Sequence, residues 1–383
     1  LLQEGTGLLT ITGPSGIGKT RLALQVAANV FKDFEDGVFF VPLASITNPD
    51  LVTATITQAL GLKVGENQPG VELLKRSLRD KQMLLVLDNF EQVIAAAPLL
   101  GELLTAAPDL KILVTSQAVL HLYGEYEFNV PPLAVPDLND LPPLENLANL
   151  PAVALFVSRA QAVSGNFQLT NENARILAEI CVRLEGIPLA LELAAARSKL
   201  FAPHALLTEL SHRLTLSVQK SADVMPRHQT LRNAVAWSYH LLEPDEQALF
   251  AQLGVFVGGF TLEAADAVCA GKNPEVPMLE QLASLVDKSM LQHGRRENGA
   301  PRFFMLETLR EYALEQLEAL GQTQAARRQH WTYYLHLVES IEPPPKEPDL
   351  PTWMKQLEEE YDNIRAALKW SLEQDEVEAA LRI

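Results

Sequence analysis

The stretch Gly13-Pro14-Ser15-Gly16-Ile17-Gly18-Lys19-Thr20 reads G-x-x-x-x-G-K-T. An apolar run at 8–12, suited to a buried strand, precedes it, and apolar residues at helical spacing follow it from Leu22 to Val30. In this context glycines let backbone N–H groups converge on a phosphate, Lys19 can reach the β- and γ-phosphates, and the Thr20 hydroxyl can bind Mg²⁺. A glycine-rich turn that matches by chance would not need such flanks. We therefore predict a site for a nucleoside triphosphate with Mg²⁺, formed by Gly13, Ser15, Gly16, Gly18, Lys19, Thr20 and Arg21.

The composition is that of an ordinary soluble globular chain, with 383 residues, 48% apolar and 21% charged. A formal charge of −17 argues against a nucleic-acid-binding surface, which needs a net basic face. No apolar run approaches the roughly 20 residues of a membrane helix, and no signal-peptide pattern opens the chain. We therefore expect a cytoplasmic protein that makes no contact with membrane or, through this segment, with nucleic acid.

The two cysteines and the two chain ends carry further expectations. Cys181 and Cys269 have no cysteine or histidine nearby at metal-ligand spacing, so we interpret both as reduced core residues. The first strand pattern begins almost at Leu1, and a helical pattern continues to Ile383. We expect both ends to be cuts in a longer protein.

The first 130 residues alternate between strand-like and helix-like patterns. After the first helix come apolar strand candidates at 38–41, 83–87 and 110–114, with helix candidates at 51–60 and 71–78. The strands are short and mostly apolar without alternation, as expected when helices cover both faces of a parallel sheet. The alternation predicts an α/β domain at 1–130.

The rest of the chain has few strand signals. Six prolines fall between Pro131 and Pro151, which predicts a linker at 131–150. We then expect a helical domain at 151–222, a winged-helix domain at 223–320 and the start of a TPR-like helical repeat at 321–383. Predicted helices lie at 152–163, 171–184, 188–200, 205–214, 231–241, 244–253, 262–268, 278–287, 309–320, 325–341 and 353–372, and a two-strand wing at 289–291 and 302–306.

Polar residues end two of the strands in the α/β domain. Asp88 closes the apolar run at 83–87, where a carboxylate can hold Mg²⁺ or can serve as a helix N-cap. The next strand ends in Thr115-Ser116-Gln117, where a polar residue could sense a γ-phosphate or cap the following segment. Further on, Gly186-Ile187-Pro188 separates two helices, as a C-cap glycine followed by proline at the next helix start.

These pieces together resemble the nucleotide-binding core of the STAND ATPases, of NB-ARC or AP-ATPase type. The resemblance is nearest to bacterial regulators of the LuxR and SARP types and covers most of the chain. It rests on GPSGIGKTRLAL at 13–24, LLVLDNFEQV at 84–93, ILVTSQAVL at 112–120, LEGIPLALELAAAR at 184–197, RHQTLRNAVAWSYHLLEPDEQALF at 227–250, VFVGGFTLEAADAVC at 255–269, LVDKSML at 285–291 and MLETLREYALEQL at 305–317.

The resemblance implies a role for several positions. Lys19 and Thr20 would bind phosphate and Mg²⁺, and Asp88 would be the second Mg²⁺ anchor. Pro188 would pack on the adenine from the helical domain. Segment 305–311 would close on a bound ADP.

The chain departs from the family pattern at three positions. Gln117 stands where the family usually has arginine, and Leu306 where many members have histidine. Both put strict discrimination of ATP from ADP in doubt. Asn89 replaces a second acid, which leaves Glu91 as the candidate general base.

The resemblance implies an ATP- and ADP-dependent switch with slow hydrolysis. ADP would hold a closed form, ATP would open it for self-association, and an unknown inducer would act at the C-terminal repeats. One alternative is a P-loop kinase or another metabolic enzyme, although no compact lid or second-substrate pocket is evident. The other is DNA binding through the winged helix, which the excess of acids over bases at 226–320 disfavours.

Overall fold

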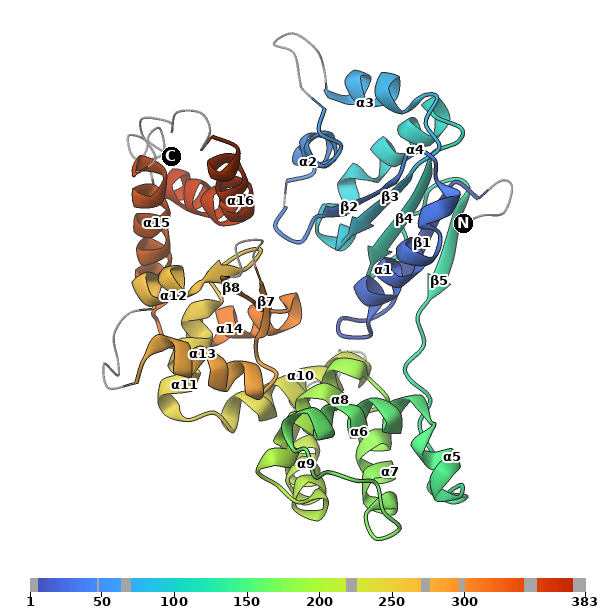
Figure 1. The fold of residues 1–383 in the computed structure, drawn as a ribbon, viewed down its shortest axis with the longest axis vertical. Helices are drawn as coiled ribbons and strands as arrows, with labels where there is room; N and C mark the ends of the chain where they lie inside the picture. The colour runs from blue at the N-terminus through green and yellow to red at the C-terminus, as the bar shows by residue number, and fades with distance from the viewer. Residues whose placement is uncertain are drawn as a thin grey trace. The chain divides into compact units, whose positions relative to one another are not determined.

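The computed structural model describes residues 6–46, 48–62, 70–217, 226–269, 276–295, 300–340 and 350–374. Both chain ends, which we expect to be cuts in a longer protein, lie outside these ranges. The chain divides into two compact units, Leu1–Pro132 and Leu133–Ile383, whose elements are labelled in Figure 1. Within the ranges given above, no helix is both long and apolar enough to cross a membrane.

The first unit is built on a five-stranded sheet in the order β2-β3-β4-β1-β5, and each neighbouring pair runs parallel. Parallel strands need crossover connections, which helices supply here. In chain order the elements are β1 Leu8–Thr12, α1 Lys19–Asn29, the 3-10 helix η1 Phe31–Asp33, β2 Val38–Pro42, α2 Leu51–Ala59, α3 Gly70–Leu78, β3 Leu84–Asp88, the 3-10 helix η2 Phe90–Ala96, α4 Ala97–Ala106, β4 Lys111–Ser116 and β5 Glu125–Asn129. The predicted α/β fold with a parallel sheet is confirmed.

Helices cover both faces of this sheet (Figure 1). Along β3, Leu84 and Val86 belong to the core that includes Ala23 of α1. Leu85 and Leu87 belong to the core formed with α2, α3 and α4. Because successive side chains of a strand point to opposite faces, a strand buried on both faces is an unbroken apolar run.

Strand β5 is an element that the sequence does not predict. Its residues Glu125-Tyr126-Glu127-Phe128-Asn129 alternate polar and aromatic side chains and are mostly exposed. The strand lies at the edge of the sheet, where it pairs with β1 from Leu8↔Glu125 to Thr12↔Asn129. An edge strand with little burial has no apolar run, so its place depends on the backbone of β1 rather than on a local pattern.

The second unit is helical and contains one small sheet. Its elements are α5 Leu144–Ala148, α6 Pro151–Val163, α7 Ala174–Arg183, α8 Pro188–Ala195, the 3-10 helix η3 Ala196–Lys199, α9 Pro203–Ser217, α10 Pro226–His240, α11 Pro244–Leu253, β6 Phe260–Thr261, α12 Leu262–Val268, α13 Met278–Asp287, β7 Gln292–Arg295, β8 Pro301–Phe304, α14 Glu307–Ala319, α15 Thr323–Glu339 and α16 Leu350–Glu373. One apolar core continues from Leu147 in α5 to Trp370 in α16. The regions expected at 151–222, 223–320 and 321–383 therefore share buried side chains.

The first predicted wing strand, at 289–291, is wrong. Ser289 has a φ of 56°, and the amides of Met290 and Leu291 both donate to the carbonyl oxygen of Leu285. Met290 and Leu291 are buried, so their apolar character reflects packing at the end of α13. The wing consists of β7 and β8, and β6 pairs antiparallel with β8 as a third strand.

Other predicted boundaries shift by a few residues. The second wing strand, predicted at 302–306, is Pro301–Phe304, and Leu306 is the N-cap of α14, half-buried against the core. The helix predicted at 188–200 ends at Ala195 and continues as η3. The short helix α5 lies inside the segment expected as a linker.

Candidate functional site

The loop between β1 and α1 adopts a backbone that only glycine takes easily. Gly13, Gly16 and Gly18 have φ angles of 145°, 73° and 97°. A Cβ atom on Gly13 would also lie 3.2 Å from Cγ2 of Ile17. In loops of this kind, successive backbone N–H groups can converge on an anion.

Lys19, the first residue of α1, turns back into this loop. Its Nζ donates to the carbonyl oxygens of Gly13 at 2.8 Å and Pro14 at 3.2 Å. The side chain is buried, and burial lowers the pKa of the Lys19 ammonium, while Glu91 and Asp88 raise it in part. A cation is thus held inside the loop, where it can act on an anion.

Asp88, the last residue of β3, accepts two hydroxyl hydrogen bonds on one oxygen. Oγ1 of Thr20 donates to its Oδ1 at 2.8 Å, and Oγ1 of Thr115 donates to the same atom at 2.6 Å. Burial raises the pKa of the Asp88 carboxyl, and the two hydroxyls and the Lys19 ammonium lower it in part. The N-cap of η2 is Asn89, not Asp88, so the alternative of a helix cap is not observed.

This arrangement fits a magnesium nucleotide. A hydroxyl that donates its proton to a carboxylate leaves its lone pairs for another partner, which is the state of Thr20 beside Asp88. Hydroxyl and carboxylate oxygens are ligands that Mg²⁺ prefers. The loop, the Lys19 cation and the Thr20–Asp88 pair are the parts expected around a bound triphosphate and its metal.

Gln117 connects the loop with Glu91. Its Nε2 donates to Oγ of Ser15 at 3.2 Å and to Oε1 of Glu91 at 3.3 Å. The cap of the following segment is Ser116, whose Oγ accepts from the amide of Ala118 at 3.2 Å. Oε2 of Glu91 is buried and has no hydrogen-bond partner among the residues described. A buried carboxylate oxygen without a partner is uncommon and suggests a functional role.

Two of the predicted site residues lie outside this network. Arg21 is exposed on α1, just beyond Thr20. Pro188 is in the second unit, at the start of α8. Gly186 before it has a φ of 64°, and a Cβ there would lie 2.1 Å from the carbonyl oxygen of Leu133. The structural interpretation of this segment, a glycine turn and then proline at a helix start, is confirmed.

Sequence reasoning noted Thr115 only as one of three polar residues at a strand end and did not include it among the site residues. Thr115 is buried in β4, next to β3, and it contacts Asp88 across the two strands. The available signal was a polar residue at the carboxyl end of the strand that neighbours Asp88. The sequence alone does not show that these two strands are adjacent.

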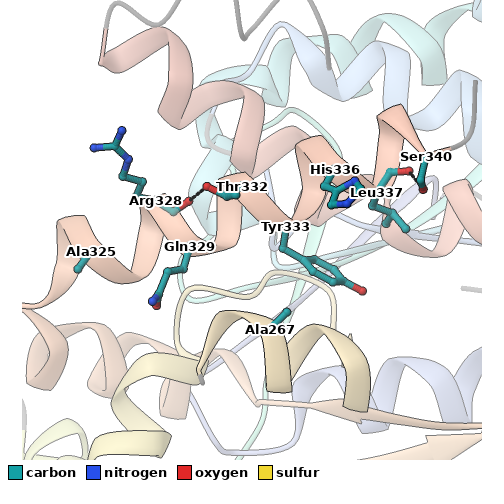
Figure 2. A pocket seen from close by; sticks show the side chains of 9 residues that line it. All are labelled: Ala267, Ala325, Arg328, Gln329, Thr332, Tyr333, His336, Leu337 and Ser340. Atoms are coloured by element: carbon teal, nitrogen blue, oxygen red, sulfur yellow. Dashed lines mark hydrogen bonds between the residues drawn. The ribbon is translucent and has the colours of Figure 1, made fainter. Parts of the chain in front are cut away.

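An open groove of about 780 Å³ runs along α15 beside α12 (Figure 2). The hydroxyls of Thr332 and Ser340 donate to backbone carbonyls of their own helix. Its described lining contains no carboxylate and no glycine loop, so it differs in kind from the site around Lys19. The lining residues are Ala267, Ala325, Arg328, Gln329, Thr332, Tyr333, His336, Leu337 and Ser340.

Two protein families match parts of the chain. Residues 2–129 match a family described as AAA domain, and residues 242–318 match a winged helix-turn-helix domain. Among solved structures, the STAND protein with a tetratricopeptide repeat sensor PH0952 from Pyrococcus horikoshii is similar in fold. It has a TM-score of 0.50 at 17% identity, over 98% of this chain and 52% of that one.

Several bacterial proteins are similar in sequence. Rv0890c of Mycobacterium tuberculosis (strain ATCC 25618 / H37Rv), provisionally named an HTH-type transcriptional regulator, is 39% identical over 378 residues. The alignment covers 98% of this chain and 41% of that protein, so the chain spans about two fifths of that relative's length. Regulatory protein AfsR of Streptomyces coelicolor (strain ATCC BAA-471 / A3(2) / M145) is 28% identical over 314 residues, 79% of this chain and 28% of that protein.

These findings weigh against the expectation that this segment makes no direct contact with nucleic acid. The matched domain at 242–318 is a winged helix-turn-helix, and Rv0890c carries the name of a transcriptional regulator. The expectation rested on charge, and a formal charge is a sum that does not decide what one surface contacts.

Family membership rests on a relative of similar extent. The uncharacterized protein Rv0894 of the same Mycobacterium tuberculosis strain is 38% identical over 323 residues, which are 83% of this chain and 78% of that protein. The chain therefore belongs to the family of Rv0894, and it carries an AAA-type P-loop domain followed by a winged helix-turn-helix domain.

Proposed function

We propose that this chain is the ATP- and ADP-dependent switch module of a cytoplasmic signal-transduction ATPase that regulates transcription. The observation that carries the proposal is the Thr20–Asp88 hydrogen bond beside the buried Lys19 cation. The regulator names of the relatives support the transcriptional role. The sequence resemblance supports the finer assignment to STAND regulators of the SARP and LuxR types.

Each residue of the site has a stated task in this proposal. Lys19 exchanges its bonds to loop carbonyls for bonds to phosphate oxygens, and Thr20 and Asp88 hold Mg²⁺. Bound Mg²⁺ supplies positive charge that offsets the charge of the phosphates. Glu91 accepts a proton from the attacking water through its unpartnered oxygen, and Gln117 holds Glu91 near the loop.

Turnover is slow in this proposal. Gln117 offers no cation to a γ-phosphate, and Asn89 stands where many relatives have a second acid. We expect hydrolysis well below the ~10 s⁻¹ that is typical of enzymes. Slow hydrolysis suits a switch, because the bound nucleotide then sets the state of the protein for longer.

The nucleotide controls the switch through its different affinity for two conformations. ADP bound in the first unit and in contact with Pro188 of the second unit favours a closed form, and ATP favours an open form that self-associates. The helices α15 and α16 are the start of a TPR-like sensor that receives the inducer. The motif at 184–197 and its place in the family resemblance support this scheme.

Calorimetry with ADP and Mg²⁺ tests the nucleotide site. Lys19→Ala removes the cation from the loop without changing the core, so we expect binding to fall below detection with the fold retained. Lys32→Ala is the matched control, because Lys32 is exposed in the same unit and its loss changes the charge equally. Unchanged ADP affinity in Lys19→Ala would contradict the proposal. In a separate assay with ATP, transfer of phosphate to a small acceptor molecule would favour the kinase alternative.

A second candidate function is contact with DNA through residues 242–318, which the winged helix-turn-helix match favours. Helix α13 is the last helix before the wing strands β7 and β8, and it carries no lysine or arginine. Contact of this helix with DNA would therefore depend on backbone amides and on basic residues outside it. Fluorescence anisotropy with labelled duplex DNA tests it over a series of salt concentrations. Affinity that falls linearly on a logarithmic salt scale supports DNA contact. Absence of binding at low salt excludes it.

A further inference from the structure

The hydroxyl of Thr115 takes part in two hydrogen bonds that determine its direction. Its Oγ1 accepts from the backbone amide of Asn89 at 3.0 Å and donates to Oδ1 of Asp88 at 2.6 Å. Thr115 is 1% exposed, so water does not compete for either bond. The amide N–H of Asn89 donates to a lone pair of the Thr115 oxygen. The single proton of the Thr115 hydroxyl is therefore directed to Asp88.

These bonds restrain the end of β3 in two ways. Asn89 has a φ of 61°, so the chain turns sharply just after Asp88, and Thr115 holds the amide of that turn. Thr115 and Thr20 both donate to Oδ1 of Asp88. Within the described ranges no hydrogen bond reaches Oδ2, so that oxygen is left for another ligand.

A second buried threonine shows what a packing role alone looks like in this sheet. Thr10 in β1 is 0% exposed, and its Oγ1 has no hydrogen-bond partner in the described part of the chain. Thr10 therefore contributes its shape to the sheet but no polar contact. Thr115 is buried to the same extent, but its hydroxyl both donates a hydrogen bond to Asp88 and accepts one from the amide of Asn89.

We propose that Thr115 is a positioning residue, whose hydroxyl fixes the Asp88 carboxylate in the orientation that supports Mg²⁺ bound with the nucleotide. The inference rests on the proposed function, because it concerns the same site. It adds a residue that acts through Asp88 without touching the nucleotide. It also gives β4 an indirect part in metal binding, through Asp88.

The experiment measures how much Mg²⁺ increases ADP affinity, by calorimetry of the whole chain in Mg²⁺ and in EDTA. Thr115→Val keeps the shape of the side chain and removes the hydroxyl. We expect the Mg²⁺-dependent gain in affinity to fall about tenfold or more, since one hydrogen bond to a charged group is lost, while affinity in EDTA stays within about twofold. Thr115→Ser keeps the hydroxyl and should retain the gain. Thr10→Val is the matched control and should behave like the wild type.

Several outcomes would overturn the inference. A Thr115→Val protein that folds and keeps the full Mg²⁺-dependent gain would show that the hydroxyl is not needed. Equal loss of affinity in Mg²⁺ and in EDTA would assign Thr115 to the shape of the loop instead. If Thr115→Val does not fold, Thr115→Ser provides the test. Loss of the Mg²⁺-dependent gain in ADP affinity in Thr115→Ser, which keeps the hydroxyl, would contradict a role of the hydroxyl. Wild-type protein that does not bind ADP under either condition would refute the proposed function itself, and this inference with it.

Discussion

Replacing one member of the buried Arg302–Glu360 ion pair tests how firmly α16 is held to the wing. The two side chains are 7% and 6% exposed. Nη2 of Arg302 donates to the carbonyl oxygens of Gly259 at 3.2 Å and Glu359 at 2.7 Å, and Oε2 of Glu360 accepts from the hydroxyl of Tyr334 at 3.1 Å. Each charge is thus kept in the core by its partner and by neighbouring hydrogen bonds.

The burial of the pair gives the expected loss of unfolding free energy in each variant. Arg302→Met leaves the Glu360 carboxylate buried without a counter-charge, and Glu360→Leu leaves the Arg302 guanidinium in the same state. Breaking a buried pair in this way costs about 3–5 kcal/mol of unfolding free energy. The double variant removes both charges, and its main cost is the Tyr334 hydroxyl, which loses its acceptor, about 1–3 kcal/mol. The Gly259 carbonyl oxygen still accepts from Nδ2 of Asn363 at 2.7 Å. We expect a coupling energy of about 3 kcal/mol between the two positions.

Urea unfolding followed by tryptophan fluorescence measures this coupling. The rings of Trp331 in α15 and Trp370 in α16 have centroids 5.9 Å apart and therefore report on this part of the unit. The control is the ion pair of Arg232 and Glu315, which are 60% and 44% exposed. Its coupling should stay below about 1 kcal/mol. A coupling for the buried pair no larger than that of the control would refute the reasoning.

Three further predictions concern separate parts of the chain. Burial lowers the pKa of His330 to about 4, below its ordinary 6.5, because the folded protein favours the neutral imidazole. The stability that this preference gives is fully present above about pH 6.5, where the unfolded chain is also neutral at this position. It is lost as the pH falls from 6.5 through 4. Unfolding free energy should drop by about 3 kcal/mol more in the wild type than in His330→Gln over this range, and His204→Gln should behave like the wild type. Glu91→Gln should lower phosphate release from ATP about a hundredfold with ADP affinity kept, and unchanged release would exclude Glu91 as the base. Gly186→Ala should destabilise the protein by about 2 kcal/mol or more, because its Cβ would lie 2.1 Å from a backbone oxygen. Gly165→Ala, where a Cβ meets no atom within 4 Å, should leave the melting temperature almost unchanged.

Local patterns were sufficient for most of the first unit. The strand run at 83–87 and the loop at 13–20 predict a parallel sheet with a phosphate-binding turn, because burial on both faces and positive φ angles restrict which residues can occupy those positions. The same reasoning located Lys19, Thr20 and Asp88. These residues are recognisable because their chemistry depends on their place in a motif.

Local patterns failed where a neighbour decides the outcome. Strand β5 has no apolar run of its own, and it becomes a strand because β1 offers a free edge. Residues 289–291 are apolar because they enter the core at the end of α13, which resembles a strand signal in the sequence. The charge summed over the chain likewise led us to expect no contact with nucleic acid, and the winged helix-turn-helix match at 242–318 weighs against that expectation.

The sequence by itself determined the class of fold, the phosphate-binding loop and the acid that ends the third strand, because each depends on residues that are close together along the chain. Only the tertiary structure decided that Thr115 bonds to Asp88, that Gln117 joins Ser15 to Glu91, and that Arg302 meets Glu360. The physical reason is that a polar side chain has many potential partners of the same chemistry. Which one it meets depends on the order of strands and the packing of helices, and these bring together residues that are far apart in the chain.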